Sequence, residues 1–269
     1  MRKLINPCGL HCINNIGVNI GEQVILHDVN LHVHCGNLVA LIGKNGAGKS
    51  TLIRAILGDI PHTGTIDLKD HENGNLQKMK IGYVPQKNVL FSGTIASNLL
   101  YGFEADPKDV QKEMQENNIS EEEAVSKLAD NAMKKAAQIA QATEFINEKP
   151  EQYDSAIAQS GGNVSGGQKQ RLAIARALVK KCPIYIFDDS FSALDFKTDA
   201  QLRKALKSET TNATVLIVAQ RVGTIMGADQ IIVLDEGKIA GIGTHRELLQ
   251  NCQVYADIAH SQLSEEELA

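Results

Sequence analysis

The chain has 269 residues, of which 43% are hydrophobic and 22% charged, ordinary proportions for a globular protein of one large or two small domains. Lys and Arg number 27 against 32 Asp and Glu, a net charge of −5, which argues against a nucleic-acid partner. No apolar run approaches the roughly 20 residues that span a bilayer, and the first residues do not open a signal peptide. The five cysteines are an odd, unevenly spaced set, which favours a reducing cytoplasmic location over a disulfide framework.

Short strands and turns dominate the first part of the chain. Apolar runs separated by glycine-containing turns over residues 13–42 predict a small β meander, and its last run, residues 38–42, is typical of a strand buried on both faces. Helical spacing over residues 50–57 ends at Gly58. Residues 81–84 are a further short strand, closed by a proline.

The composition then changes to alanine, glutamine and charged residues between positions 102 and 160, and residues 124–146 have long helical spacing. Residues 104–127 hold eight acidic and three basic residues, which alone account for the net charge of −5. A solvated helical insertion is favoured here over an acidic docking tail.

Strands alternate with helices in the remainder of the chain. A helix over residues 168–180 precedes a strand over 184–187, and further strands follow at 214–218 and 230–234. We therefore predict an α/β fold, with a parallel core sheet flanked by helices, an antiparallel β-subdomain at the N-terminus and a helical subdomain in the middle.

A phosphate-loop pattern, G-x-x-x-x-G-K-[ST], lies between the buried strand and the helix that follows it. Its glycines let backbone N–H groups surround phosphate oxygens, and the helix adds its positive end. Lys49 supplies a charge for the β- and γ-phosphates, and the Ser50 hydroxyl is a ligand for Mg²⁺. The predicted nucleotide site consists of Gly43, Lys44, Asn45, Gly46, Ala47, Gly48, Lys49, Ser50 and Thr51.

A second glycine-rich segment stands at the head of another predicted helix. Ser165, Gly166, Gly167 and Gln168 lead directly into the helical run of residues 171–178, and a flexible linker would not continue in this way. The segment is therefore a second anion-binding helix N-terminus with added side-chain donors. Because the phosphate loop already serves one nucleotide, a composite site is predicted.

These motifs together resemble those of ATP-binding-cassette (ABC) ATPases across essentially the whole chain. The resemblance rests on the phosphate loop, Gln86 after a strand, residues 164–168, the strand that ends at Asp188, and the Ser-Ala-Leu-Asp segment that ends at Asp195. It implies a P-loop NTPase with a RecA-like core in a single domain of residues 1–269. The implied parts are residues 1–86 (β-subdomain and phosphate loop), 87–167 (helical subdomain with the acidic insertion) and 168–269 (second part of the core).

The resemblance also implies roles and partners. In that family two chains dimerise head to tail, and each ATP lies between the phosphate loop of one chain and the signature helix of the other. Carried over, Asp188 and Ser50 hold Mg²⁺, Gln86 senses the γ-phosphate and the metal, and Asp195 contacts a second ATPase subunit in a homo- or heterodimer. A transmembrane permease subunit would contact the helical subdomain, which places the chain in the cytoplasm, peripheral on the inner face of the cell membrane.

Two positions depart from the family pattern at the same chemical step. Asp189 stands where the family has a water-positioning Glu, and Gln220 stands where it has a His that contacts the γ-phosphate. The Asp189 carboxylate is one methylene short, and Gln cannot carry a positive charge, so weak hydrolysis at this chain's own site is expected. Tolerated variation is the alternative. A third departure concerns recognition of the adenine of ATP. Ile20 or Val18 stands where the family usually has an aromatic residue that stacks on the adenine.

The two ends of the chain resemble different subfamilies. The first third is similar to ATPase subunits of metal importers, and the remainder to the degenerate half of heterodimeric exporters, with a plausible join at residues 82–86; we hypothesise a hybrid sequence. The predicted function is an ATP-binding, energy-coupling subunit of an ABC transporter. The alternative is a non-hydrolysing, ATP-gated dimerisation half of a heterodimeric exporter. A soluble DNA-repair or translation ATPase is disfavoured, because neither coiled-coil heptads nor a second cassette is present.

Six potential metal ligands gather near the N-terminus: Cys8, His11, Cys12, His32, His34 and Cys35. His32 and His34 would share one face of a strand, an arrangement that would suit a surface zinc site. The spacing matches no structural zinc pattern, and scattered residues on a β-subdomain are the favoured interpretation.

Overall fold

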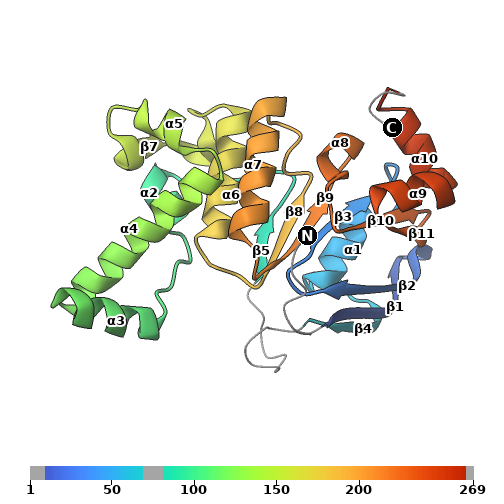
Figure 1. Cartoon of the computed structure of the whole chain (residues 1–269), viewed down its shortest axis with the longest axis horizontal. Coiled ribbons are helices and arrows are strands. Elements are labelled where there is room, and N and C mark those ends of the chain that lie inside the picture. The colour runs from blue at the N-terminus through green and yellow to red at the C-terminus, as the bar shows by residue number, and fades with distance from the viewer. Residues whose placement is uncertain (1–9, 69–80, 265–269) are drawn as a thin grey trace. The chain divides into compact units, whose positions relative to one another are not determined.

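The computed structural model describes residues 10–68 and 81–264, and these residues belong to two compact units (Figure 1). The core unit contains residues 10–68, 81–83, 183–192 and 210–264, and the helical unit contains residues 84–182 and 193–209. The sequence motifs had grouped residues 168–269 as one part, whereas the contacts place residues 168–182 and 193–209 in the helical unit.

A three-stranded antiparallel sheet with the order β2-β1-β4 forms the N-terminal part of the core unit. Its strands are β1 (Leu10–Ile20), β2 (Gln23–His34) and β4 (Thr63–Asp67). Apolar and polar residues alternate along β2, so that Leu26, Val29, Leu31 and Val33 are buried while the residues between them face outward. The predicted antiparallel β-subdomain is confirmed.

The second sheet of the core unit has six strands in the order β11-β10-β3-β9-β8-β5. Pairings β10–β3, β3–β9 and β9–β8 are parallel, and every residue of β8 is buried, as a strand covered on both faces requires. The strands are β3 (Leu38–Ile42), β5 (Ile81–Val84), β8 (Ile184–Asp188), β9 (Thr214–Val218), β10 (Gln230–Asp235) and β11 (Lys238–Gly243).

One edge of this sheet differs from the all-parallel expectation. β11 pairs antiparallel with β10, and the two strands are joined by Glu236 and Gly237, both in the left-handed region with φ of 43° and 76°. Two such residues suit a tight hairpin turn. A side chain at Gly237 would place its Cβ 2.1 Å from the Ile25 carbonyl oxygen, so the glycine also allows the turn to lie against β2.

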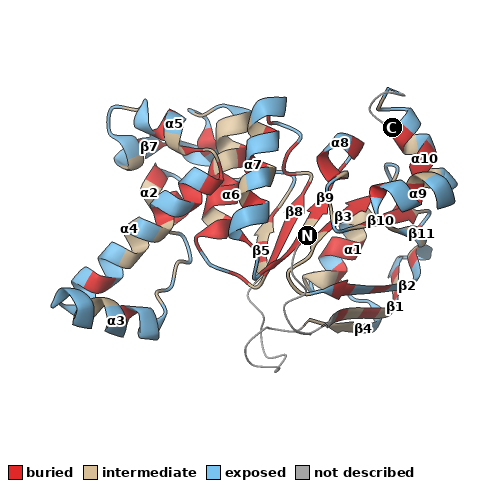
Figure 2. Ribbon diagram, in the orientation of Figure 1, coloured by how far each residue is buried: buried red, intermediate tan, exposed pale blue. Residues whose placement is uncertain are grey.

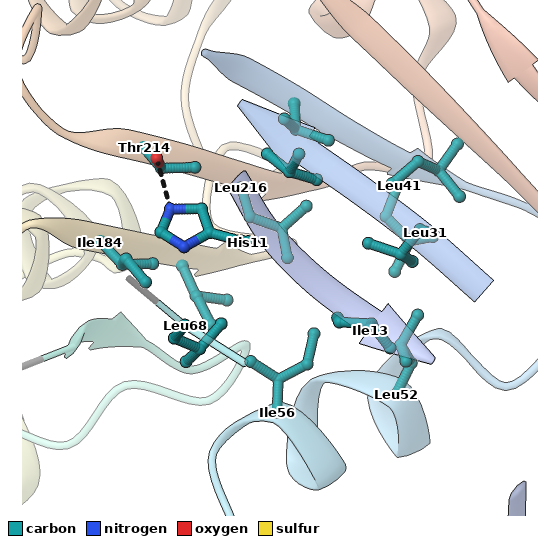
Figure 3. Close-up of a pocket in the computed structure, with 14 residues that line it drawn as sticks. His11, Ile13, Leu31, Leu41, Leu52, Ile56, Leu68, Ile184, Thr214 and Leu216 are labelled. Atoms are coloured by element: carbon teal, nitrogen blue, oxygen red, sulfur yellow. Dashed lines mark hydrogen bonds between the residues drawn. The ribbon is translucent and has the colours of Figure 1, made fainter. Parts of the chain in front are cut away.

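The apolar core of the unit lies where the two sheets and helix α1 (Lys49–Ile56) meet (Figure 2). Leu52, Ile53 and Ala55 of α1 are fully buried there. A cavity of about 50 Å³ remains in this core, and Figure 3 shows its lining. The lining is aliphatic except for Thr214 and His11, whose Nε2 lies 2.9 Å from the Thr214 hydroxyl.

Three further helices of the core unit follow β9 and β11. They are α8 (Val222–Ile225), α9 (His245–Asn251) and α10 (Gln253–His260). Thr244 caps α9 by accepting the Glu247 backbone N–H, and the Glu247 carboxylate accepts the Thr244 N–H in return. α10 is fixed by Tyr255, which is fully buried and whose hydroxyl lies 2.7 Å from Nδ1 of His245.

The helical unit contains the acidic stretch as a pair of helices, α3 (Pro107–Asn117) and α4 (Glu121–Ile139). Asp106 caps α3 with a proline in the first turn, and Ser120 forms a capping box with Glu123 at the start of α4. Acidic residues in these first turns complement the helix dipoles. The expected helical insertion is therefore present, with most of its charged residues exposed.

Gln141 interrupts the continuous helix expected over residues 124–146. Its φ is 56°, a left-handed conformation that ends α4 and starts a new helix, α5 (Thr143–Asn147). The other elements of the unit are β6 (Gly93–Thr94), α2 (Ile95–Leu99), the 3-10 turns at Gln152–Asp154 and Gln159–Gly161, β7 (Ala156–Ile157), α6 (Gly166–Leu178) and α7 (Phe196–Glu209). Within residues 10–68 and 81–264, no helix has the length and apolar character needed to cross a membrane.

Candidate nucleotide-binding site

The phosphate-loop segment joins β3 to α1 in the core unit, as its sequence predicts. Two of its glycines are required by close approach. A Cβ at Gly43 would lie 2.1 Å from the Leu234 carbonyl oxygen, and one at Gly48, where φ is 102°, would lie 2.7 Å from Leu26 Cδ2. Both positions therefore need glycine. The loop is held tightly against β10 and β2, while Lys44, Asn45 and Gly46 at its tip are exposed.

The Lys49 side chain folds back over the loop. Its Nζ donates to the carbonyl oxygens of Gly43 at 2.7 Å and Lys44 at 2.9 Å. Burial lowers the pKa of Lys49, and the carboxylates of Asp189 and Asp188 oppose this change. The ammonium group is thus positioned at the loop beside two negative charges, a suitable place for a cation that pairs with phosphate oxygens.

Asp188 ends strand β8 and is buried, with 8% of its surface exposed. Burial raises the pKa of its carboxyl group, and the neighbouring Asp189 raises it further, whereas a hydrogen bond with Tyr83 and the charge of Lys49 lower it. A buried carboxylate next to a second one is a group that a divalent cation would stabilise. Tyr83, on β5, was not singled out from the sequence, because its role depends on the pairing of strands distant in the chain.

Asp189 and Gln220, the two departures from the family pattern, contact each other. Gln220 Nε2 donates to Asp189 Oδ2 at 2.8 Å. Asp189 has a φ of 47°, a strained conformation for a residue other than glycine, and its backbone N–H donates to the Val218 carbonyl oxygen at 3.0 Å. The end of β8 and the end of β9 are therefore joined twice, through the backbone and through this side-chain pair.

The core unit thus brings together Lys49 from the start of α1, Asp188 and Asp189 from the end of β8 and Gln220 from just beyond β9. Ser50 is exposed in the first turn of α1. A hydroxyl and a carboxylate are the hard oxygen ligands that Mg²⁺ prefers, and the excess of negative charge at Asp188 and Asp189 fits a divalent cation. Ser50 and Asp188 are the residues that would hold it.

The signature segment belongs to the helical unit and begins α6. The Ser165 hydroxyl accepts the Gln168 backbone N–H at 3.2 Å, and Gln168 Oε1 accepts the Ser165 N–H at 3.0 Å. This capping box explains why a serine and a glutamine flank two glycines here. Gly166 is exposed at the helix start, which leaves the end of the helix accessible to an anion.

Gln86 and Asp195 also belong to the helical unit. Gln86 is exposed and lies two residues beyond β5. Asp195 is exposed and caps α7, since its carboxylate accepts the Thr198 N–H at 2.9 Å and the Thr198 hydroxyl at 2.7 Å. These hydrogen bonds lower the pKa of Asp195, so the residue carries a fixed negative charge at neutral pH.

The two candidates for base contact differ in accessibility. Ile20, at the end of β1, is 56% exposed, whereas Val18 is 2% exposed and belongs to the core. Val24, across the turn, is also exposed at 45%. Only Ile20 of the two candidates offers a surface to a base, and that surface is aliphatic.

The N-terminal Cys and His residues do not assemble a metal site in the described part of the chain. Neither residues 10–68 nor 81–264 contain a group of three or more His, Cys, Asp or Glu side chains that could hold a metal ion. His11 is buried and contacts Thr214 and, at 3.5 Å, the Cys35 sulfur. Cys8 lies outside the described residues.

A phosphate loop between a buried strand and a helix, with a buried carboxylate at the end of β8, a parallel strand of the same sheet one strand away from β3, defines a P-loop NTPase. The chain belongs to the ABC transporter family, because the family model described as ABC transporter matches residues 26–192. An uncharacterized ABC transporter ATP-binding protein of Mycobacterium tuberculosis is 40% identical over 88% of this chain and 38% of its own length. An ATP-dependent lipid A-core flippase of Albidiferax ferrireducens is 35% identical over 97% of this chain and 42% of its own length.

A solved structure, a bacterial Atm1-family ABC exporter with ATP bound, is similar with a TM-score of 0.78 and 32% identity, over 97% of this chain and 43% of that one. The chain therefore spans about two fifths of the length of these relatives. ATP hydrolysis coupled to transport is the general activity of the family. The exporter match includes most of the first third of the chain, where a likeness to metal importers was noted, and the suggested join at residues 82–86 stays a prediction.

Proposed function

We propose that this chain is the ATP-binding, energy-coupling domain of an ABC transporter of the exporter type, and that it binds Mg·ATP as a single ABC ATPase domain. The observation that carries the proposal is the position of Lys49 in the phosphate loop after β3, close to the charge of Asp188 at the end of β8 in the same sheet. Lys49 would bind the β- and γ-phosphates, and Ser50 and Asp188 would hold the metal. Mg²⁺, when bound, neutralises charge on the β- and γ-phosphate oxygens.

The signature segment supports a head-to-tail dimer with a second ABC ATPase subunit. The start of α6, with Ser165, Gly166, Gly167 and Gln168, provides an accessible helix N-terminus in addition to the phosphate loop. The phosphate loop already serves the nucleotide bound by this chain. We therefore assign the α6 N-terminus to the ATP bound by the partner. Asp195, charged and exposed, would contact that partner.

Own-site hydrolysis is proposed to be slow. Asp189 would accept a proton from, or orient, the attacking water, but its carboxylate is short and Oδ2 already accepts a hydrogen bond from Gln220. Gln220 keeps that carboxylate in place and presents an amide rather than a cation toward the γ-phosphate. The same hydrogen bond favours the second candidate function, a non-hydrolysing half that binds ATP and completes the site of a competent partner.

The helical unit carries a surface that suits a membrane-embedded partner. Val89, Phe91 and Tyr101 are 52%, 47% and 57% exposed, and the two rings lie 4.9 Å apart between centroids. Arg176 donates to the Val89 carbonyl oxygen and covers the Phe91 ring at 5.4 Å, which fixes the shape of the patch. We assign this surface to a transmembrane permease segment, which would hold the domain at the cytoplasmic face of the cell membrane.

Equilibrium binding of Mg·ATP to the purified chain tests the proposal. The Lys49→Ala variant should lose most of its affinity, whereas Lys44→Ala should retain it, because the Lys44 side chain is exposed and only its backbone carbonyl meets Lys49. Equal affinity of the parent and Lys49→Ala chains, or no binding by either, would contradict the proposed site.

A further inference from the structure

A glutamine near the C-terminal end of the described chain is hydrogen-bonded to the backbone groups on both sides of Arg221, directly after the Gln220 side chain. Gln262 Oε1 accepts the Val222 backbone N–H at 2.8 Å, and its Nε2 donates to the Gln220 carbonyl oxygen at 2.8 Å. One carboxamide therefore pairs with two backbone groups, as a neighbouring strand would. An amide supplies the donor and the acceptor that this pairing needs, and a carboxylate or an ammonium group supplies only one of them.

Gln262 is itself held by a well-packed helix. It follows α10, whose Tyr255 and Ala259 are fully buried. The backbone N–H groups of Gln262 and Leu263 both donate to the Ala259 carbonyl oxygen, at 3.0 and 2.9 Å. The Gln262 side chain is exposed to solvent. Its two hydrogen bonds therefore depend on where α10 places its backbone and not on burial of the side chain.

Gln262 binds the segment that directly follows the last backbone pairing of β9 with β3. Up to Ala219, which donates to the Leu41 carbonyl oxygen at 3.1 Å, the backbone is paired with β3. Beyond it the chain leaves the sheet and enters α8, a helix of 4 residues. Gln220 lies in this transition, and its own side chain is exposed.

The Gln220 side chain connects this backbone segment to the carboxylate of Asp189, the candidate water-positioning group. Its Nε2 donates to Asp189 Oδ2 at 2.8 Å, while the Asp189 N–H is fixed separately to Val218. A continuous series of hydrogen bonds therefore runs from Gln262 through the Gln220 backbone and side chain to the Asp189 carboxylate. Gln262 therefore holds the backbone from which the exposed Gln220 side chain extends.

We propose that Gln262 is a positioning residue for ATP hydrolysis: it sets the Gln220 amide against the Asp189 carboxylate from the C-terminal end of the domain. This inference rests on the proposed function, in which Gln220 and Asp189 face the γ-phosphate and the attacking water. A misplacement of about 1 Å at such a step can lower a rate on the order of a hundredfold, so a residue that touches no substrate can still control the reaction.

The first test measures position and does not depend on activity. In ¹H–¹⁵N spectra of the full chain, the Gln220 side-chain amide and the Asp189 backbone amide should shift when Gln262 is replaced in Gln262→Met, which keeps the length of the side chain and removes both hydrogen bonds. Gln253→Met is the matched control, because Gln253 also lies on the α10 segment and donates to Asp257 at 2.7 Å, away from Gln220. Unchanged Gln220 and Asp189 resonances in Gln262→Met would overturn the inference.

The second test measures single-turnover phosphate release with the chain in excess over Mg·ATP. Gln262→Met should be at least about tenfold slower than the parent, with ATP affinity within about twofold, because only the placement of the reacting groups changes. Gln253→Met should match the parent. For Gln262→Glu, we compare the rate of phosphate release with that of the parent at each pH. This ratio should rise as the pH falls from 8 toward 5, because a protonated carboxyl group can again donate a hydrogen bond to the Gln220 carbonyl oxygen.

A rate in Gln262→Met equal to that of the parent, or a fall explained wholly by weaker ATP binding, would show that Gln262 is only a structural link. A Gln262→Glu ratio that does not change with pH would show the same. If the parent binds ATP but releases no phosphate, the proposed slow hydrolysis fails, and the amide spectra alone then decide whether Gln262 positions the pair.

Discussion

Replacing Asp189 with glutamate is expected to accelerate ATP hydrolysis by this chain about a hundredfold. The added methylene advances the carboxylate by roughly 1–1.5 Å, and an error of about 1 Å in the placement of a reacting group costs on the order of 10² in rate. That factor corresponds to about 2.7 kcal/mol of activation free energy. Because Asp189 Oδ2 is bonded to Gln220 at 2.8 Å, the longer side chain must also leave or re-form that hydrogen bond.

A double-mutant cycle separates the contribution of the Gln220 side chain from that of Asp189. Gln220→His alone should give a small gain, since His can carry a positive charge toward the γ-phosphate but faces a short carboxylate. The double variant should exceed the sum of the single effects on the logarithmic scale, because the two side chains touch. Steady-state phosphate release with saturating Mg·ATP measures all four chains, and Asp257→Glu, on the exposed side of α10, is the control for adding a methylene.

Unaltered turnover in Asp189→Glu, in a chain that still binds ATP and unfolds at the parental temperature, would refute this reasoning. It would mean that the length of the carboxylate does not limit the chemical step. An equal gain in Asp257→Glu would instead trace the effect to stability or concentration of active chain.

Three further predictions follow from single features of the core unit. Gly43→Ala should abolish ATP binding and lower the melting temperature, because its Cβ would lie 2.1 Å from the Leu234 carbonyl oxygen. Ile20→Trp creates the single tryptophan of a chain that has none, and its fluorescence should be quenched on Mg·ATP binding, with tighter affinity than the parent. His245→Asn should flatten the fall of melting temperature between pH 7 and 5, since burial lowers the pKa of His245 and an unfolded His takes up a proton near its usual pKa of about 6.5.

The sign of the His245 effect follows from linkage. Its depressed pKa means that the unfolded chain binds more protons than the folded chain below about pH 6.5, so stability is lost as the pH falls through that value. If the melting temperature of His245→Asn falls between pH 7 and 5 as steeply as that of the parent, the assigned role of His245 is contradicted. Parental ATP affinity in Gly43→Ala would contradict the close approach of the loop to β10, and unquenched fluorescence in Ile20→Trp would place the base elsewhere.

Local patterns predicted the parts of the site that are continuous in the chain. The phosphate loop with Lys49 and the strand that ends at Asp188 lie at the strand ends where periodicity and glycine spacing placed them, since each is determined by neighbours within a few residues. Asp189 and Gln220 were each noted as departures from a family pattern, yet their hydrogen bond depends on the parallel pairing of β8 with β9 and could not be seen in either segment alone.

The features that sequence reasoning missed depend on long-range contacts. Tyr83 meets Asp188 across 105 positions, and Gln262 binds the backbone at Gln220 from beyond α10. The edge strand β11 was missed because its residues alternate between exposed and half-buried and carry few large apolar side chains. The assignment of α6 and α7 to the helical unit reflects packing rather than any break in composition.

Steady-state phosphate release by the purified chain with saturating Mg·ATP, beside Lys49→Ala, tests the central claim most directly. A chain that binds ATP in its phosphate loop but positions water poorly should release phosphate well below about 1 s⁻¹, the lower end of ordinary enzyme turnover, and measurably faster than Lys49→Ala. Turnover at or above about 1 s⁻¹ that Lys49→Ala abolishes would contradict the weak own site. A rate indistinguishable from that of Lys49→Ala would contradict hydrolysis at this site altogether.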